Sequence, residues 1–384
     1  MRNMRKSILV LSVILLATVV FPLFSVLAEE DYNVTYYRAK VTEVLEREDR
    51  VTEYSGGAFE ENFQIVNALI LKGPYKGLTV TAEYALNYGL SDQHKADLLR
   101  KNDHVMLYLE TDPGGEIQAV YVAEIARDRH LLALLLAFFL FLVIVGGMKG
   151  FKAIISLILT VFAILFILIP SILNGRDPVL LSAVICIFII GLTLLIISGF
   201  NKKTLSAVIG TAGGVLIAGL IAVLVGNMAK ISGFSADESQ MLLYIPQDIV
   251  IDFRGLLFAA ILIGSMGATM DIGMTVASSM HEVKVNRPDI LPLDLFKAGM
   301  NVGRDAMATM TNTLILAYTG GSLQLMILLM AYRTPFNNII NWDVIASEIL
   351  KGLAGSIGII FTVPITALAA GLIENHMARK REGR

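Results

Sequence analysis

Residues 131–175 read LLALLLAFFLFLVIVGGMKGFKAIISLILTVFAILFILIPSILNG, and the only charged side chains among them are Lys149 and Lys152. The two lysines leave charge-free runs at 131–148 and 153–175. A helix needs about 20 apolar residues to cross the roughly 30 Å hydrocarbon core of a bilayer. The stretch therefore predicts two membrane-spanning helices joined by a short basic turn.

Further charge-free runs occur on both sides of this stretch. One of them, 255–270, reaches spanning length only if Asp271 lies inside the membrane. We therefore expect an α-helical polytopic membrane protein with seven core spans and an additional N-terminal hydrophobic segment. The remaining charge-free runs of spanning length are 7–28, 178–201, 204–229, 306–332 and 352–373.

Composition agrees with this class. Of the 384 residues, 55% are hydrophobic and 17% are charged, whereas soluble proteins have roughly 25% charged residues. The mean hydropathy is +0.68, so the lipid bilayer is the first expected partner. The net charge of −2 argues against binding of nucleic acid, and the single cysteine, Cys186, excludes a disulfide within the chain.

Basic residues distinguish the two sides of the membrane. When Met1–Lys6 is placed in the cytoplasm, alternating spans put residues 29–130 outside and the C-terminus inside. Turns on the outside hold single basic residues, as the positive-inside rule requires. The basic residues placed inside are Arg2, Arg5, Lys6, Lys149, Lys152, Lys202, Lys203, Lys284, Arg287, Lys297, Arg304, Arg379, Lys380, Arg381 and Arg384.

The chain divides into four predicted parts. Residues 1–28 are a signal peptide or an N-terminal membrane anchor, because a basic start and an apolar run precede a cleavage-like Val26-Leu27-Ala28. Residues 29–129 form an extracytoplasmic β domain, 130–376 the seven-helix membrane domain, and 377–384 a basic cytoplasmic tail.

The part before the first core span has the character of a small β domain. Turn sequences such as SGG at 55–57, KGPYKG at 72–77 and DPGG at 112–115 separate short β-rich runs. Five strands in about 100 residues are typical of a small β-barrel of the OB type. The predicted strands are 36–45, 63–71, 78–86, 105–109 and 119–125, with a helical turn near 93–100.

One span contains a stripe of small residues and a carboxylate. Ala260, Gly264, Ala268, Asp271 and Thr275 recur at spacings of three and four, which places them on one helical face. We expect this face to be the closely packed one, with Asp271 away from lipid. An ionisable residue inside a membrane is costly and is normally paired and functional, although a helix that ends early would leave Asp271 at the interface.

A second polar cluster begins the next span. Asp305, Thr309 and Asn312 share one helical face, at a depth similar to that of Asp271. We predict that these two faces form a binding site for an ion or substrate. Tyr318 lies further along the same span, before the pair Gly320-Gly321. Such a pair can break a membrane helix, as in many transporters, although it more often marks a packing site or a mild kink.

These two polar stretches resemble the signature of the YibE/F-like family of bacterial multi-pass membrane proteins. The similarity is carried by GSMGATMD at 264–271, SSMHE at 278–282, GRD at 303–305 and TMTNTLILAY at 309–318. It implies the layout of a β domain before seven spans and a location in the bacterial cell (plasma) membrane. It implies no substrate and no catalytic residue.

Motifs of soluble enzyme chemistry are missing from the sequence. There is no phosphate-binding loop, and His281-Glu282 lacks the second histidine of a zinc protease motif because Val285 stands in its place. We therefore expect that the protein is not an enzyme and binds no cofactor. The sequence does not decide whether it binds a metal. An intramembrane hydrolase with Asp271 and Asp305 as its carboxylate pair is the least favoured alternative.

The sequence favours a transporter or channel for a small ion or solute. The alternative is a membrane scaffold or accessory subunit whose β domain binds a partner. A homo-oligomer or a complex with another membrane protein is compatible with both functions.

Overall fold

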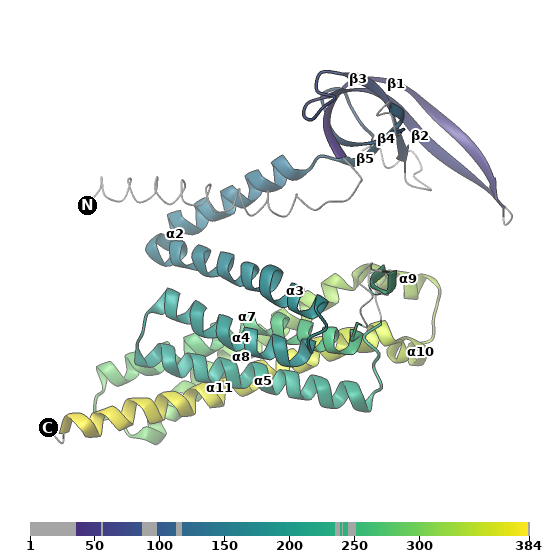
Figure 1. The fold of residues 1–384 in the computed structure, drawn as a ribbon. Helices are drawn as coiled ribbons and strands as arrows, with labels where there is room; N and C mark the ends of the chain where they lie inside the picture. The colour runs from purple at the N-terminus through teal and green to yellow at the C-terminus, as the bar shows by residue number, and fades with distance from the viewer. Residues whose placement is uncertain are drawn as a thin grey trace, which may run out of the picture. The chain divides into compact units, whose positions relative to one another are not determined.

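The computed structural model describes residues 36–54, 57–86, 98–112, 117–234, 239, 241–244 and 251–382. The chain divides into two compact units, with the boundary between Phe141 and Leu142. The first unit holds the strands and the start of the first long helix, and the second holds the other helices (Figure 1).

The first unit is built on a closed barrel with the strand order β1-β2-β3-β5-β4. All five strands predicted from the sequence are present. The hairpin of β1 and β2 is longer than predicted and pairs as far as Tyr54 and Gly57, and Figure 1 shows it reaching away from the barrel. Residues 93–97 of the predicted helical turn lie outside the described residues. The strands are β1 (Tyr36–Tyr54), β2 (Gly57–Ile70), β3 (Thr79–Leu86), β4 (His104–Thr111) and β5 (Ile117–Ile125).

Alternation along the strands fills the barrel. On β4, Val105, Leu107 and Leu109 point inward and are buried, because successive side chains of a strand face opposite sides. The buried Gln64 accepts a hydrogen bond from the backbone N–H of Leu99 (2.8 Å) and donates one to its carbonyl oxygen (2.9 Å). β1 and β4 close the barrel as antiparallel neighbours, whereas β3 and β5 are parallel at Glu83 and Tyr121.

The first two predicted spans form one helical stretch of 46 residues, Asp128–Leu173. It comprises α2 (Asp128–Phe162), the π-helical turn η2 (Ala163–Leu168) and α3 (Ile169–Leu173). Gly147 interrupts it with a φ of 57° and a ψ of −134°. A positive φ is readily adopted only by glycine, so Gly147 marks the turn that the sequence predicted at the neighbouring lysines.

In the described residues, five helices are long and apolar enough to cross a membrane, and six if a bent pair counts as one span. Asp177, Asn201 and Asp252 cap three of these helices, since each side chain accepts a hydrogen bond from the backbone N–H three residues later. The remaining elements are α4 (Pro178–Ser198), α5 (Lys202–Met228), η3 (Leu242–Tyr244), α7 (Phe253–Asn286), α8 (Pro292–Gly321), α9 (Leu323–Ala331), α10 (Phe336–Asn341) and α11 (Asp343–Glu382).

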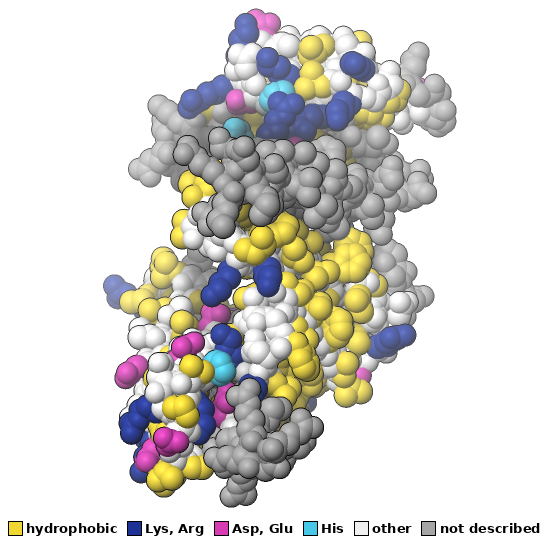
Figure 2. Space-filling model, turned by 90° about the vertical axis from the view of Figure 1, so that its left-hand side faces the viewer, with side chains coloured by type: hydrophobic (Ala, Val, Ile, Leu, Met, Phe, Trp, Pro, Cys, Tyr) yellow, Lys and Arg dark blue, Asp and Glu magenta, His cyan; other side chains and the backbone are white. Residues whose placement is uncertain are grey.

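Helix α11 contacts α5, α7 and α8 and forms the centre of the second unit. Large apolar side chains also remain exposed on this unit, among them Leu180, Leu220 and Leu372, and Figure 2 shows such side chains covering much of one face. An exposed apolar surface of this extent is expected where lipid surrounds the protein.

Small residues bring α5 and α11 into close contact. A Cβ atom on Gly214 would lie 2.7 Å from the backbone oxygen of Gly358 and would collide with the hydroxyl of Thr362. Gly210 makes a similar approach to Thr366. Small residues allow such approaches between membrane helices, so these glycines have a packing role.

The first prediction tests this contact. Gly214→Leu should lower the free energy of unfolding by about 1–3 kcal/mol, because the new side chain meets the backbone of α11, which cannot rotate away. Denaturation in mixed micelles with increasing dodecyl sulfate measures this change. Gly191→Leu in α4 is the matched control, since nothing lies within 4 Å of its added Cβ. Equal stabilities of the two variants would contradict the assigned contact.

Candidate functional site

The small-residue stripe of α7 does not lie on the packed side of the helix. Ala260, Gly264, Asp271 and Thr275 are exposed and Ala268 is half-buried. The buried face carries Leu262, Met266, Thr269, Ile272 and Val276 instead. The expectation that Asp271 is on the packed side is therefore wrong, because the neighbouring helices pack against the other face of α7.

The polar residues of α8 are also exposed. Asp305, Thr309 and Asn312 lie on a surface face, and the Thr309 hydroxyl donates to the carbonyl oxygen of Ala306 (2.9 Å). The opposite face packs on α7 and α11 through Met307, Met310 and other apolar side chains. The structure gives no hydrogen bond between the side chains of Asp271 and these α8 residues. It thus does not join the predicted residues in one enclosed polar site.

Of the alternatives left open for Gly320-Gly321, the structure shows a break in the span at 306–332. Helix α8 ends at Gly321, and α9 continues after a bend of 58°. Tyr318 lies just before the bend, and its hydroxyl oxygen would be 2.5 Å from a Cβ on Gly264 of α7. Gly264 therefore makes room for Tyr318. This contact joins one residue of the predicted stripe on α7 to one of the predicted site residues on α8.

A cavity of about 490 Å³ lies beside the bend, between α8, α9, α10 and α11. Its wall is mostly apolar, with polar groups from Tyr318, Thr319, Ser322 and Glu348. Glu348 is paired with Lys351, whose Nζ lies 2.6 Å from its Oε1. Sites for small molecules are typically apolar hollows with a few placed polar groups, and this cavity has that character.

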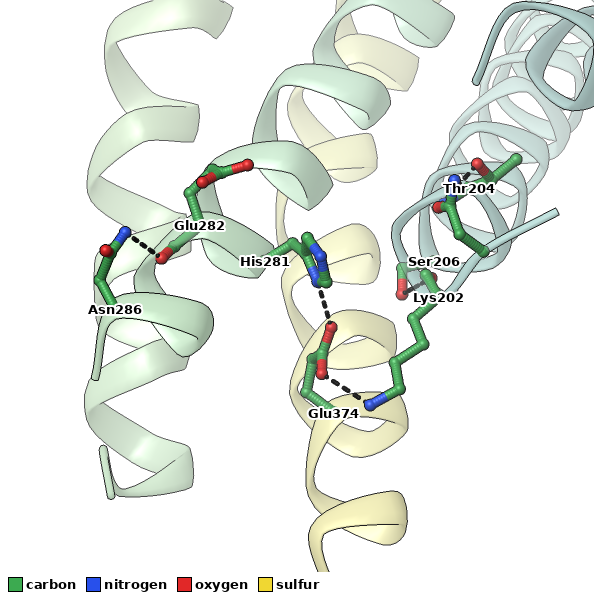
Figure 3. A network of polar contacts seen from close by, with 8 residues as sticks. Lys202, Thr204, Ser206, His281, Glu282, Asn286 and Glu374 are labelled. Carbon is green, nitrogen blue, oxygen red and sulfur yellow. Dashed lines mark hydrogen bonds and ion pairs between the residues drawn. The ribbon is translucent and has the colours of Figure 1, made fainter. Parts of the chain in front are cut away.

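A buried carboxylate forms a second polar centre, away from the predicted residues. Glu374 of α11 is 6% exposed, and each of its carboxylate oxygens has a partner (Figure 3). Lys202 of α5 donates from Nζ to Oε2 (3.1 Å), and Nδ1 of His281 of α7 lies 2.8 Å from Oε1. We call these three residues the Lys202–Glu374–His281 triad.

The triad follows from the contact between α5 and α11. Gly214 faces Thr362 and Gly210 faces Thr366, so each step of four residues toward the start of α5 matches a step of four residues toward the end of α11. Two more such steps place Lys202 opposite Glu374. The first residue of α5 and the far end of α11 are thus brought together by the small residues between them.

The sequence contains a signal for this triad in its isolated ionisable residues. His281 is the sole histidine between residues 131 and 375, and Glu374 ends an uncharged run of more than 20 residues. Lys202 stands at the start of a predicted span, among the basic residues that set its orientation. Within the described residues, no group of three His, Cys, Asp or Glu side chains is arranged to hold a metal ion.

The comparison with known families identifies the class of this membrane protein. Residues 134–376 match the family model described as YibE/F-like protein, which confirms the resemblance seen in the sequence. The chain belongs to the YibE/F-like family. Searches of curated proteins and of solved structures find no match to the chain.

A double-mutant cycle tests the energetic coupling in the triad. Glu374→Gln and Lys202→Met should each destabilise the protein, and their coupling free energy should be about 1–2 kcal/mol. This value is below that of a fully buried pair because the Lys202 side chain is 36% exposed. Denaturation in mixed micelles gives the four required free energies.

The pair Lys297–Asp294 of α8 serves as the control for this cycle. Its side chains are 64% and 54% exposed and its charged atoms are 3.6 Å apart, so its coupling should stay below about 0.5 kcal/mol. Equal couplings for the two pairs would refute a special role of burial at Glu374.

Proposed function

We propose that this protein is a transporter or channel for a small ion or solute. The observation that carries the proposal is the broken helix pair α8–α9 with the cavity beside it. Interrupted helices expose backbone groups that coordinate ions or substrates in many transporters. In this proposal, the protein catalyses no chemical reaction and needs no cofactor.

The proposed ion- or substrate-binding residues are Asp271, Asp305, Thr309, Asn312 and Tyr318. Tyr318 lines the cavity, and the other four lie on the exposed sides of α7 and α8. Exposed polar side chains within a bilayer are costly. Contact with a water-filled path, or with another membrane helix, would remove this cost.

We further propose a complete architecture of seven core spans in the bacterial plasma membrane. The break at Gly147 supports counting Asp128–Leu173 as two spans, and the bent pair α8–α9 counts as another. An OB-type identity of the barrel is supported by its strand order and by its parallel β3–β5 pair. The barrel then lies outside the cell and the C-terminus in the cytoplasm.

Flux measurements test the proposed transport. Purified protein in proteoliposomes should move at least one member of a panel of small cations and anions. Asp271→Asn keeps the volume of the side chain but removes its charge. Flux should fall by at least about tenfold, since that factor corresponds to about 1.4 kcal/mol of lost ion stabilisation.

The controls separate this effect from loss of folding. Glu110→Asn removes a carboxylate from the exposed end of β4 in the barrel and should leave flux unchanged. An Asp271→Asn protein with normal abundance and full flux would overturn the role of Asp271. A wild-type protein that moves no member of the panel would favour the scaffold instead.

The second candidate function is a membrane scaffold or accessory subunit. It is favoured by the exposed polar face of α8 together with the exposed small-residue stripe of α7. Both surfaces suit contact with another helix, because small residues and interhelical hydrogen bonds stabilise helix pairs in membranes. The partner would be a second copy of the chain or another membrane protein.

Labelling of introduced cysteines tests the proposed orientation. On a Cys186→Ser background, a membrane-impermeant thiol reagent should label Asn337→Cys from outside the intact cell and should not label Arg287→Cys. The positive-inside rule is the physical reason. Permeabilised cells provide the control, in which both positions should react, and external labelling at Arg287→Cys would reverse the orientation.

A further inference from the structure

The barrel separates its charges by position. Residues 29–130 carry 11 basic and 19 acidic side chains, a net charge of −8. One end of the barrel, which we call the basic end, comprises residues 38–40, 71–78, 98–104 and 124–129. These segments hold eight basic and three acidic side chains, so a net charge of +5 is gathered on an otherwise acidic domain.

Backbone hydrogen bonds hold these segments together. The N–H of Leu71 donates to the carbonyl of Arg38 (2.8 Å), and that of Asn102 donates to the carbonyl of Val41 (2.8 Å). The N–H of Ala126 donates to the carbonyl of His104 (2.9 Å). The basic end is therefore a fixed part of the barrel, and Figure 2 shows Lys and Arg side chains gathered beside a histidine on this unit.

A groove of about 680 Å³ opens at the basic end. Arg38, Lys72 and Arg127 line it together with Tyr36, Tyr37 and the first residue of α2, Asp128. The groove thus offers three cations and two aromatic rings around one carboxylate. Such a lining suits a negatively charged group that carries an apolar body.

Some of the charges at the basic end are compensated internally. Both Nη atoms of Arg38 bind the Asp128 carboxylate, at 2.9 and 2.5 Å, and Arg127 pairs with Glu124 at 3.0 Å. Lys72, Lys76 and Lys101 are exposed, and the structure gives no ion pair for them among the described residues. These three lysines contribute much of the excess positive charge.

The histidine at the basic end reports the same positive field. Burial lowers the pKa of His104 below its ordinary value, and the charges of Arg129, Arg38 and Lys40 lower it further, while Asp128 acts in the opposite direction. Nε2 of His104 lies 3.3 Å from Nη1 of Arg129. The arginine is on the first turn of α2, so the positive field extends to the helix.

The start of α2 places the basic end beside the membrane. Arg127 precedes Leu131, the first residue of the apolar run, by four residues, or about 6 Å at the rise of an α-helix. Each headgroup layer of a bilayer is about 5–8 Å thick. The exposed side chains of Leu78 (45%) and Tyr36 (54%) also belong to this region, and such residues are suited to a membrane interface.

We infer that the basic end of the barrel binds the anionic headgroups of the bilayer that α2 enters. The exposed lysines attract the lipid phosphates, and the groove accepts one headgroup beside Arg38 and Arg127. This contact would fix the barrel at the membrane surface. The occupant is a lipid and not a free anion, because the groove ends at Asp128, three residues before the apolar run of α2 begins.

The experiment measures the proximity of the barrel to headgroups in the full-length protein. A fluorophore is attached at Leu78→Cys on the Cys186→Ser background, and vesicles contain a trace lipid with a nitroxide on its headgroup. Quenching should increase when phosphatidylglycerol replaces part of the phosphatidylcholine. It should decrease again in salt of about 1 M, where the screening length is about 3 Å.

Charge variants make the test specific. In low salt, replacing Lys72, Lys76 and Lys101 by Gln should lower the ratio of docked to undocked barrel by about fivefold for each lysine. The matched variant with Arg at the same three positions should behave like the wild type. A fluorophore at Glu110→Cys, at the other end of β4, reports any general movement of the barrel.

Three results would overturn the inference. The first is equal quenching at Leu78→Cys in vesicles with and without phosphatidylglycerol. The second is unchanged quenching in the Gln variant. The third is that inorganic phosphate at millimolar concentration abolishes the increase in quenching, whereas chloride at the same ionic strength does not. This result would identify a free anion as the occupant.

Discussion

The close contact between α5 and α11 is the constraint on which the second unit depends. Gly214 and Gly358 leave no room for a side chain between the two helices. The backbones therefore approach closely, and the register of the contact is set by small residues that repeat every four positions. This register brings Lys202 to Glu374, where His281 of α7 completes the polar centre. A buried carboxylate is stable there because both of its oxygens have partners.

The packing of α7 explains why the polar residues remain at the surface. Its buried side chains contact α4, α5, α8 and α11, whereas most residues of the small-residue stripe remain exposed. Asp271 consequently lies on a side of α7 that stays exposed among the described residues. In a bilayer, such a face needs water or another helix. This requirement links the proposed transport to the alternative of a larger membrane assembly.

The barrel is stabilised in a different way, because its core is formed by every second side chain of each strand, which points inward. The outward residues are free to carry charge, and chain connectivity gathers the basic ones where β4 begins and β5 leads into α2. An acidic domain thus acquires a positive end at the point where the chain turns apolar. The ion pair between Arg38 and Asp128 ties β1 to the first residue of α2 and fixes this junction.

The sequence alone predicts the class of protein and the five strands, and it marks the position of the break in the span at 306–332. These features follow from local properties: the length of charge-free runs, the alternation of apolar residues and the pair Gly320-Gly321. The tertiary structure decided which face of α7 is buried and which charges meet. A stripe of residues defines a helical face, but only the neighbouring helices decide whether that face is covered. Lys202, His281 and Glu374 are far apart in the chain, so their meeting depends on the packing register of three helices and could not be read from spacing.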